Sequence, residues 1–189
     1  MIIVIIGESC SGKTTLANYF AERHYFEKVV TYTTRPIRAG EVDGVDYHFI
    51  NDENFDKLQS DNFFLETSLY NNWHYGTPLS HNRSDKIIVL SPSGMRKLKK
   101  ITDKDELITV YLRVPRRCRM IKSLQRGDNI EEVYRRSLSD VGMFDGIENE
   151  VDHVIDNDNY EKSVNDLTRI LYSYYLDAYF QNERRFANY

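Results

Sequence analysis

An eight-residue loop near the amino terminus constrains the fold more than any other feature. Gly7-Glu8-Ser9-Cys10-Ser11-Gly12-Lys13-Thr14 fits the pattern G-x-x-x-x-G-K-[ST] at every position. An apolar run, Ile2–Ile6, precedes it, and a helical pattern over residues 14–23 follows. A glycine-rich turn that only starts a helix would explain the glycines but not the adjacent lysine and threonine. The sequence therefore predicts a nucleoside triphosphate site between a strand and a helix.

The chemistry of this loop predicts which residues contact ATP. Lys13 supplies a positive charge to the outer phosphates, and the Thr14 hydroxyl is a candidate ligand of Mg²⁺, the expected cofactor. The predicted ATP-binding residues are Gly7, Ser9, Cys10, Ser11, Gly12, Lys13, Thr14, Thr15 and the distant Asn157.

The rest of the chain alternates apolar runs with helical periods. Apolar runs without alternation are typical of parallel strands that helices cover on both faces. They lie at residues 2–6, 86–90, 107–112 and 153–155. Helical patterns follow at residues 14–23, 93–101, 115–125 and 160 to about 180. The order predicts an α/β protein, a three-layer sandwich with a parallel central sheet.

Composition excludes several classes of protein. The 189 residues are 41% hydrophobic, and each apolar run is too short to span a bilayer, which predicts a soluble globular protein. The net charge of −4 gives no global attraction to nucleic acid or to an anionic membrane, so neither is an expected partner. Two cysteines without metal or disulfide spacing, and an amino terminus unlike a signal peptide, favour a cytoplasmic location.

Three further segments carry a family resemblance. Thr31-Tyr32-Thr33-Thr34-Arg35-Pro36-Ile37-Arg38-Ala39-Gly40-Glu41-Val42-Asp43-Gly44-Val45-Asp46-Tyr47-His48-Phe49 resembles the signature of guanylate kinases. Phe64-Leu65-Glu66 and Tyr75-Gly76-Thr77 resemble the next two elements of that family, at the same spacing. With the phosphate loop, the resemblance covers most of residues 1–160.

The resemblance implies a P-loop kinase core with two inserts. The core would comprise residues 1–31, 85–114 and 150–189, an insert over 32–84 would bind GMP, and a helical lid would span 115–149. The implied reaction transfers the γ-phosphoryl group of ATP to GMP or dGMP. The acceptor oxygen is already ionised, so the reaction needs positioning and charge neutralisation rather than a general base.

The resemblance also implies the acceptor site. Arg35, Arg38, Tyr47 and Tyr75 would hold the phosphate of the acceptor, and the Glu66 carboxylate would accept from the adjacent donors of guanine. The implied GMP-binding residues are Thr31, Arg35, Arg38, Tyr47, Glu66, Tyr75 and Thr77, and the implied catalytic residues are Lys13, Arg35, Arg126 and Arg136.

Three positions depart from the family pattern. Val89 and Ser91 stand where the family usually carries aspartates, one near Mg²⁺ and one near guanine. Ser137 stands at the position of the second lid arginine, and Arg136 or Arg135 could reach the same place from the neighbouring turn. We therefore expect an active but atypical enzyme.

The departures leave alternatives open. One is a catalytically silent module of the same fold that binds proteins, and another is a kinase for a different or modified nucleoside monophosphate or for a sugar phosphate. A nucleic-acid kinase is disfavoured by the net charge. A monomer and a homodimer are both compatible with the sequence. Tyr172, Tyr175, Leu176, Tyr179 and Phe180 recur at helical spacing, and we expect this stripe to pack on the core or, less favourably, on another subunit.

Overall fold

Two β-sheets and six α-helices make up the part of the chain that the computed structural model describes. This part comprises residues 1–23, 26–38, 40–70, 72–78 and 84–186, with side chains up to residue 176. Ala39 of the signature segment, and the side chains of Tyr179 and Phe180, lie outside it.

The larger sheet is parallel throughout and has the strand order β2-β7-β1-β8-β9. Its strands are β1 (Ile2–Ile6), β2 (Glu27–Lys28), β7 (Lys86–Val89), β8 (Leu107–Arg113) and β9 (His153–Asp156). The four predicted strands are confirmed. The two-residue edge strand β2 was not predicted, because so short a segment carries no periodic signal.

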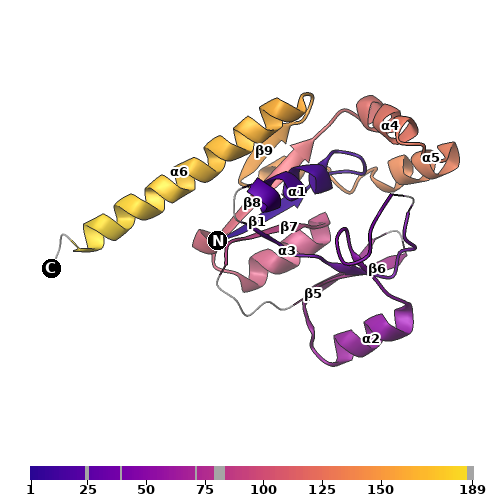
Figure 1. Ribbon diagram of the computed structural model, residues 1–189, viewed down its shortest axis with the longest axis horizontal. Helices are drawn as coiled ribbons and strands as arrows, with labels where there is room; N and C mark the ends of the chain where they lie inside the picture. Colours follow the sequence, from indigo (N-terminus) through magenta and orange to yellow (C-terminus); the bar gives the residue numbers. More distant parts are fainter. Residues whose placement is uncertain (24–25, 39, 71, 79–83, 187–189) are drawn as a thin grey trace.

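Helices cover both faces of this sheet, so the predicted three-layer sandwich is confirmed (Figure 1). Side chains alternate along β1, and Ile3 and Ile5 therefore point to one face while Val4 and Ile6 point to the other. The first face packs on α1 (Lys13–Arg23) and α6 (Tyr160–Phe186), and the second on α3 (Pro92–Ile101).

A second sheet, of order β4-β3-β6-β5, is inserted between β2 and β7. It consists of β3 (Tyr32–Thr33), β4 (His48–Phe49), β5 (Phe64–Tyr70) and β6 (Trp73–Pro78), with α2 (Asp52–Ser60) beside it. Strands β5 and β6 pair antiparallel, and a Cβ on Gly76 would lie 2.7 Å from the Phe64 ring, so this position requires glycine. Phe64 in turn stacks on Phe55 of α2, with 4.8 Å between the ring centroids.

A helical hairpin follows β8. It consists of α4 (Arg116–Gln125) and α5 (Ile130–Ser139). Two short 3₁₀ helices lie outside the hairpin, Lys104–Glu106 before β8 and Ile147–Asn149 before β9. Gly127 makes the turn between the helices with φ +88°, and the Asn129 side chain caps α5 by accepting from the backbone N–H of Glu131. The hairpin lies beside the phosphate loop in Figure 1.

Helix α6 is 27 residues long and extends well beyond the sheet (Figure 1). Leu167, Leu171 and Tyr174 face the core, at spacings of four and three residues. Packing of the aromatic stripe on the core is wrong for Tyr172, which is 64% exposed because it lies off this face. Tyr175 is also exposed, although its hydroxyl donates to Asp85 over 2.6 Å.

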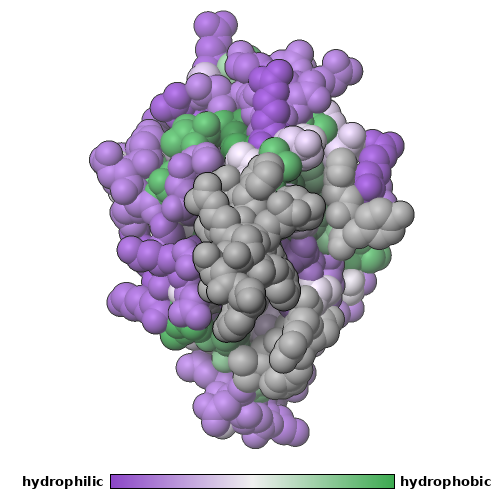
Figure 2. All heavy atoms as spheres, turned by 90° about the vertical axis from the view of Figure 1, so that its left-hand side faces the viewer, coloured by the Kyte–Doolittle hydropathy of each residue, from purple (hydrophilic) through white to green (hydrophobic). Residues whose placement is uncertain are grey.

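Hydrophilic residues dominate the face around the end of α6 in Figure 2, with smaller hydrophobic areas between them. Among the described residues, no helix is both long enough and apolar enough to cross a membrane.

Candidate active site

A cavity of about 220 Å³ lies where the phosphate loop, the second sheet and the helical hairpin meet. Most of the residues expected from the sequence line it: Gly7, Ser9, Cys10, Gly12, Lys13, Thr14, Thr15, Thr31, Arg35, Arg38, Tyr47, Glu66, Tyr75, Arg126 and Arg136. The structure thus brings together residues that are up to 129 positions apart, Gly7 and Arg136. Ser11, Thr77 and Asn157 lie behind this lining, each buried.

At the phosphate loop, Lys13 folds back so that its Nζ donates to the carbonyl oxygen of Glu8 over 2.8 Å. Burial lowers the pKa of Lys13 to about 8, although the Asp140 carboxylate opposes this shift. Gly12 has φ +93°, and Cys10 has φ +61°, so the loop uses left-handed backbone conformations to turn. A phosphate group in the loop would stabilise the charged form of the lysine.

Asn157 supports the loop from behind. Its Nδ2 donates to the Ser11 carbonyl over 2.8 Å, while its Oδ1 accepts from the Ser163 hydroxyl over 2.9 Å. A Cβ on Gly12 would lie 2.8 Å from that Nδ2, so the asparagine also explains the glycine. The side chain expected to contact ATP thus also supports the shape of the loop.

Two arginines in the loop between β3 and β4 share one carboxylate. Arg35 is only 3% exposed, and its Nη2 donates to both oxygens of Glu41, over 2.8 and 3.0 Å. The backbone N–H of Arg38 donates to Glu41 over 2.9 Å. The Arg35 guanidinium lies 5.3 Å from the centroid of the Tyr47 ring. Burial raises the pKa of Tyr47 to about 12, so its hydroxyl is a donor at neutral pH.

The helical hairpin contributes two further arginines. Arg136 is 4% exposed, and its Nη1 lies 3.1 Å from Asp128, which also pairs with Arg126. Arg126 Nη2 lies 3.5 Å from the Cys10 sulfur. These contacts hold both guanidinium groups at the rim of the phosphate loop. The basic run of the hairpin is thus not simply a solvated helix face.

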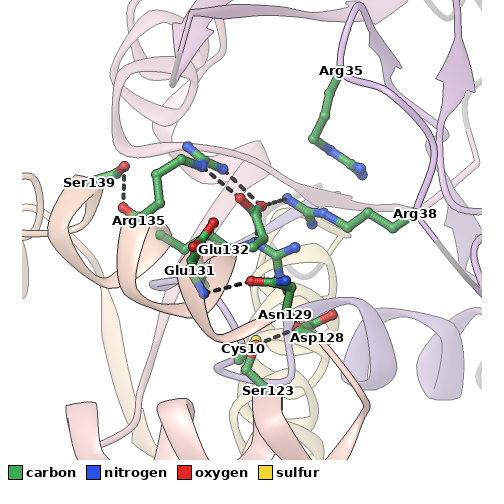
Figure 3. Close-up of polar contacts among 12 residues, drawn as sticks. Cys10, Arg35, Arg38, Ser123, Asp128, Asn129, Glu131, Glu132, Arg135 and Ser139 are labelled. Carbon is green, nitrogen blue, oxygen red and sulfur yellow. Dashed lines mark hydrogen bonds and ion pairs between the residues drawn. The ribbon is translucent and has the colours of Figure 1, made fainter.

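Glu132 connects the hairpin to the second sheet. Figure 3 shows Arg38 and Arg135 pointing toward its carboxylate from opposite sides. The distance is 2.7 Å from Arg135, 3.7 Å from Arg38 and 2.6 Å from the Nε of Arg136. The hydrogen bonds from Arg135 and Arg136 lower the pKa of Glu132 to about 2. An ionised carboxylate therefore holds arginines from both inserts together.

At the opposite end of the cavity, Glu66 presents a carboxylate with one oxygen in use. Its Oε1 accepts from the Thr77 hydroxyl over 2.7 Å, whereas its buried Oε2 has no hydrogen-bond partner among the described residues. Burial raises the pKa of Glu66. A Cβ on Gly94 would lie 3.2 Å from Oε2, so this glycine lets the start of α3 approach the carboxylate.

The positions that depart from the family pattern have their own contacts. Val89 lines the cavity with an apolar side chain, and Ser91 caps α3 by accepting from the backbone N–H of Gly94 over 3.1 Å. The Ser91 hydroxyl also lies 3.3 Å from the Ser68 hydroxyl. Ser137 faces α4, where it accepts from the Nε of Arg116 over 2.6 Å, and it does not line the main cavity.

The donor set for a metal ion is small. Thr14 lines the cavity beside Lys13, and no group of three or more acidic, histidine or cysteine side chains that could hold a metal is found among the described residues. Mg²⁺ commonly takes one or two protein oxygens together with phosphate oxygens and water. The residues present therefore fit an ion that arrives with ATP, with Thr14 as its protein ligand.

Several residues at the site were not predicted. Glu41 and Glu132 set the positions of the arginines, and Tyr70 and Ser68 line the cavity from β5. Glu132 had a local signal, since it precedes Arg135 and Arg136 by three and four residues on a helix. Tyr70 had no such local signal, because its partner Asp140 lies 70 residues away in the sequence.

Comparisons with known proteins agree with this geometry. A family model described as "Guanylate kinase" matches residues 1–174. The guanylate kinase of Zymomonas mobilis is 33% identical over 183 residues, covering 90% of this chain and 82% of that protein. The guanylate kinase of Chlorobaculum tepidum is 34% identical over 174 residues, covering 86% of this chain and 87% of that protein.

A solved structure supports the fold. The crystal structure of guanylate kinase from Anaplasma phagocytophilum superimposes with a TM-score of 0.69 at 22% identity, covering 92% of this chain and 85% of that one. The family model, the relatives and the geometry of the cavity agree, and the chain therefore belongs to the guanylate kinase family.

Proposed function

We propose that the protein transfers the γ-phosphoryl group of ATP to GMP or dGMP, giving ADP and the nucleoside diphosphate. The observation that carries the proposal is the Glu66 carboxylate, which lines the acceptor end of the cavity and whose buried Oε2 has no partner among the described residues. Guanine offers two adjacent N–H donors that one carboxylate accepts together. Adenine lacks this pair and would leave the buried carboxylate unpaired, which costs affinity.

Positively charged side chains line the part of the cavity that would receive the phosphate of the acceptor. Arg35 and Arg38 would hold its phosphate, and the hydroxyls of Tyr47 and Tyr75 would donate to it. Glu41 keeps the Arg35 guanidinium in place before a nucleotide arrives. Thr31 is buried beside the cavity and Thr77 orients Glu66, so both would act at the base.

In the proposed reaction, an ionised oxygen of the acceptor phosphate attacks the γ-phosphorus, and the bond to the bridging oxygen of ADP breaks. Lys13, Arg126 and Arg136 line the cavity near the phosphate loop, where the γ-phosphoryl group would be transferred. Arg136 would take the role of the family arginine that Ser137 replaces. Mg²⁺, held by Thr14 and the ATP phosphates, would neutralise charge on the transferred group.

The proposed setting follows from the chemistry. Both cysteines are free, and Cys10 lies within the phosphate loop, so a reducing cytoplasm suits the enzyme. The proposed partners are the nucleotides themselves. The roles of the two inserts, residues 32–84 for the acceptor and residues 115–149 as a lid, are part of the same proposal.

The variant Glu66→Gln tests the assignment. An amide in this place offers one acceptor and two donors, so it cannot accept both guanine N–H groups at once. We expect kcat/KM for GMP to fall about 30- to 100-fold, as for the loss of a hydrogen bond to a charged group, while Kd for ATP stays within a factor of two.

Glu53→Gln is the matched control, because Glu53 is exposed on α2 in the same insert. It should leave both quantities unchanged. Equal losses of GMP turnover and ATP affinity in Glu66→Gln would contradict the proposed base contact.

A further inference from the structure

Asp140 follows the last residue of α5 and joins three parts of the molecule. It is 5% exposed, and its carboxylate accepts three hydrogen bonds. The backbone N–H of Ser9 donates over 3.0 Å, the Tyr70 hydroxyl over 2.6 Å, and Nη1 of Arg119 over 3.0 Å. These donors belong to the phosphate loop, the second sheet and α4 respectively.

We infer that Asp140 is a positioning residue that couples the seating of the helical hairpin over the second sheet to the conformation of the phosphate loop. The inference rests on the proposed function only where turnover of GMP is measured. The coupling itself rests on the contacts of Asp140. A single buried carboxylate that accepts from all three parts is satisfied only when the three are in place together.

The contacts around Asp140 strengthen the link to the loop. Arg119, which donates to Asp140, also lies 3.4 Å from the Glu8 carboxylate and donates to the Val114 carbonyl over 3.0 Å. Arg119 is itself buried, so its charge requires these partners. Movement of the hairpin would therefore disturb the loop at two neighbouring positions, Glu8 and Ser9.

The link to the second sheet is also supported by a second contact. The Arg135 guanidinium lies 4.9 Å from the ring centroid of Trp73 in β6, and Glu132, three residues earlier on α5, lies 3.7 Å from Arg38 of the same insert as Trp73. Trp73 is the only tryptophan in the sequence, so its fluorescence reports this interface without a label.

The three contacts of Asp140 require a carboxylate. All three partners are donors, and an asparagine in the same place would turn its NH₂ group toward at least one of them. Tyr70→Phe is the milder change, because it removes one donor and leaves the carboxylate with its other two partners.

The experiment uses the full chain without nucleotide and then with substrates. In Tyr70→Phe we expect amide exchange in the phosphate loop, residues 7–14, to rise about fivefold, although Tyr70 is more than 50 residues away in the sequence. We expect kcat/KM for GMP to fall about fivefold in the same variant. Asp140→Asn should produce larger changes in both and shift the Trp73 emission.

A double-variant cycle separates coupling from simple damage. In the Asp140→Ala background, Tyr70→Phe should add less than a twofold further change, because alanine has already removed the acceptor of that bond. Asp145→Asn, at an exposed aspartate of the following loop, is the matched control and should leave exchange and turnover unchanged.

Three results would overturn the inference. The first is unchanged amide exchange of the loop in Tyr70→Phe, and the second is a double variant whose change equals the product of the changes in the two single variants. The third is a Tyr70→Phe protein that loses thermal stability but keeps a normal kcat/KM. If the Asp140 variants do not fold, Tyr70→Phe alone decides through loop exchange. If the wild type does not turn over GMP, the proposed function fails, and loop exchange and Trp73 emission still decide whether the coupling exists.

Discussion

Lys13 is the residue whose chemistry most directly controls the donor site. In the absence of nucleotide it is held by the Glu8 carbonyl, and its pKa lies near 8 because of burial. ATP phosphates stabilise the ammonium and raise this pKa in the complex. Binding therefore takes up a proton whenever the pH exceeds the pKa of the free enzyme.

This linkage predicts that ATP affinity is constant below pH 7 to 8 and weakens above pH 8, toward about a tenfold rise in Kd per pH unit. Calorimetric titration between pH 7 and pH 9.5 measures it. Lys13→Arg is the control, since a guanidinium remains protonated over this range. Its Kd should vary little with pH, and the same slope in both proteins would contradict the explanation.

At the same scale, the sequence predicted the site residues that chemistry demands and missed those that hold them. Lys13 belongs to a motif whose residue types follow from phosphate binding, whereas Glu66 was expected only from the family resemblance. Glu41 and Asp140 act through Arg35 and Ser9, and no local pattern indicates a hydrogen bond between residues 131 positions apart. Asn157 was predicted to contact ATP, and its support of the loop through the Ser11 carbonyl is a further role that spacing alone does not indicate.

Among the secondary-structure elements, α3 begins at a residue that departs from the family pattern, since Ser91 is its N-cap. Ser91 accepts from the backbone N–H of Gly94 and so caps the helix that approaches Glu66. An aspartate is as good an N-cap as a serine, so the cap alone does not require the serine. What differs is the charge next to the base end of the cavity.

We predict that Ser91→Ala lowers the free energy of unfolding by about 1 kcal/mol, and that Ser91→Asp keeps it within about 0.5 kcal/mol of the wild type. Urea denaturation of both variants measures the difference. An equal loss in both would mean that the Ser68 contact, rather than the cap, stabilises this position.

Element length decides how well the fold was predicted. The central strands β1, β7 and β8 are buried on both faces and read as continuous apolar runs. The second sheet contains strands of two residues, β3 and β4, which pair with each other, and β3 also pairs with β6 from a more distant segment. Its presence was expected from family resemblance, whereas its strand order came only from the structure.

At the scale of the whole molecule, the hairpin, the second sheet and the phosphate loop close on one cavity through charged contacts. Glu132 joins Arg38 to Arg136, and Asp140 joins Tyr70 to Ser9. Such contacts between separate segments are what sequence patterns describe least, because each depends on the complete tertiary arrangement. They also place both sets of arginines where a transferred phosphoryl group would need them.

The most direct test is ADP release with Mg²⁺ and ATP against GMP, dGMP, AMP, UMP, CMP and dTMP, with Lys13→Ala as the control. We expect turnover with GMP and dGMP alone, and none in the control. Turnover with AMP or the pyrimidine nucleotides at a comparable rate, or ATP binding without turnover of any acceptor, would contradict the proposed function.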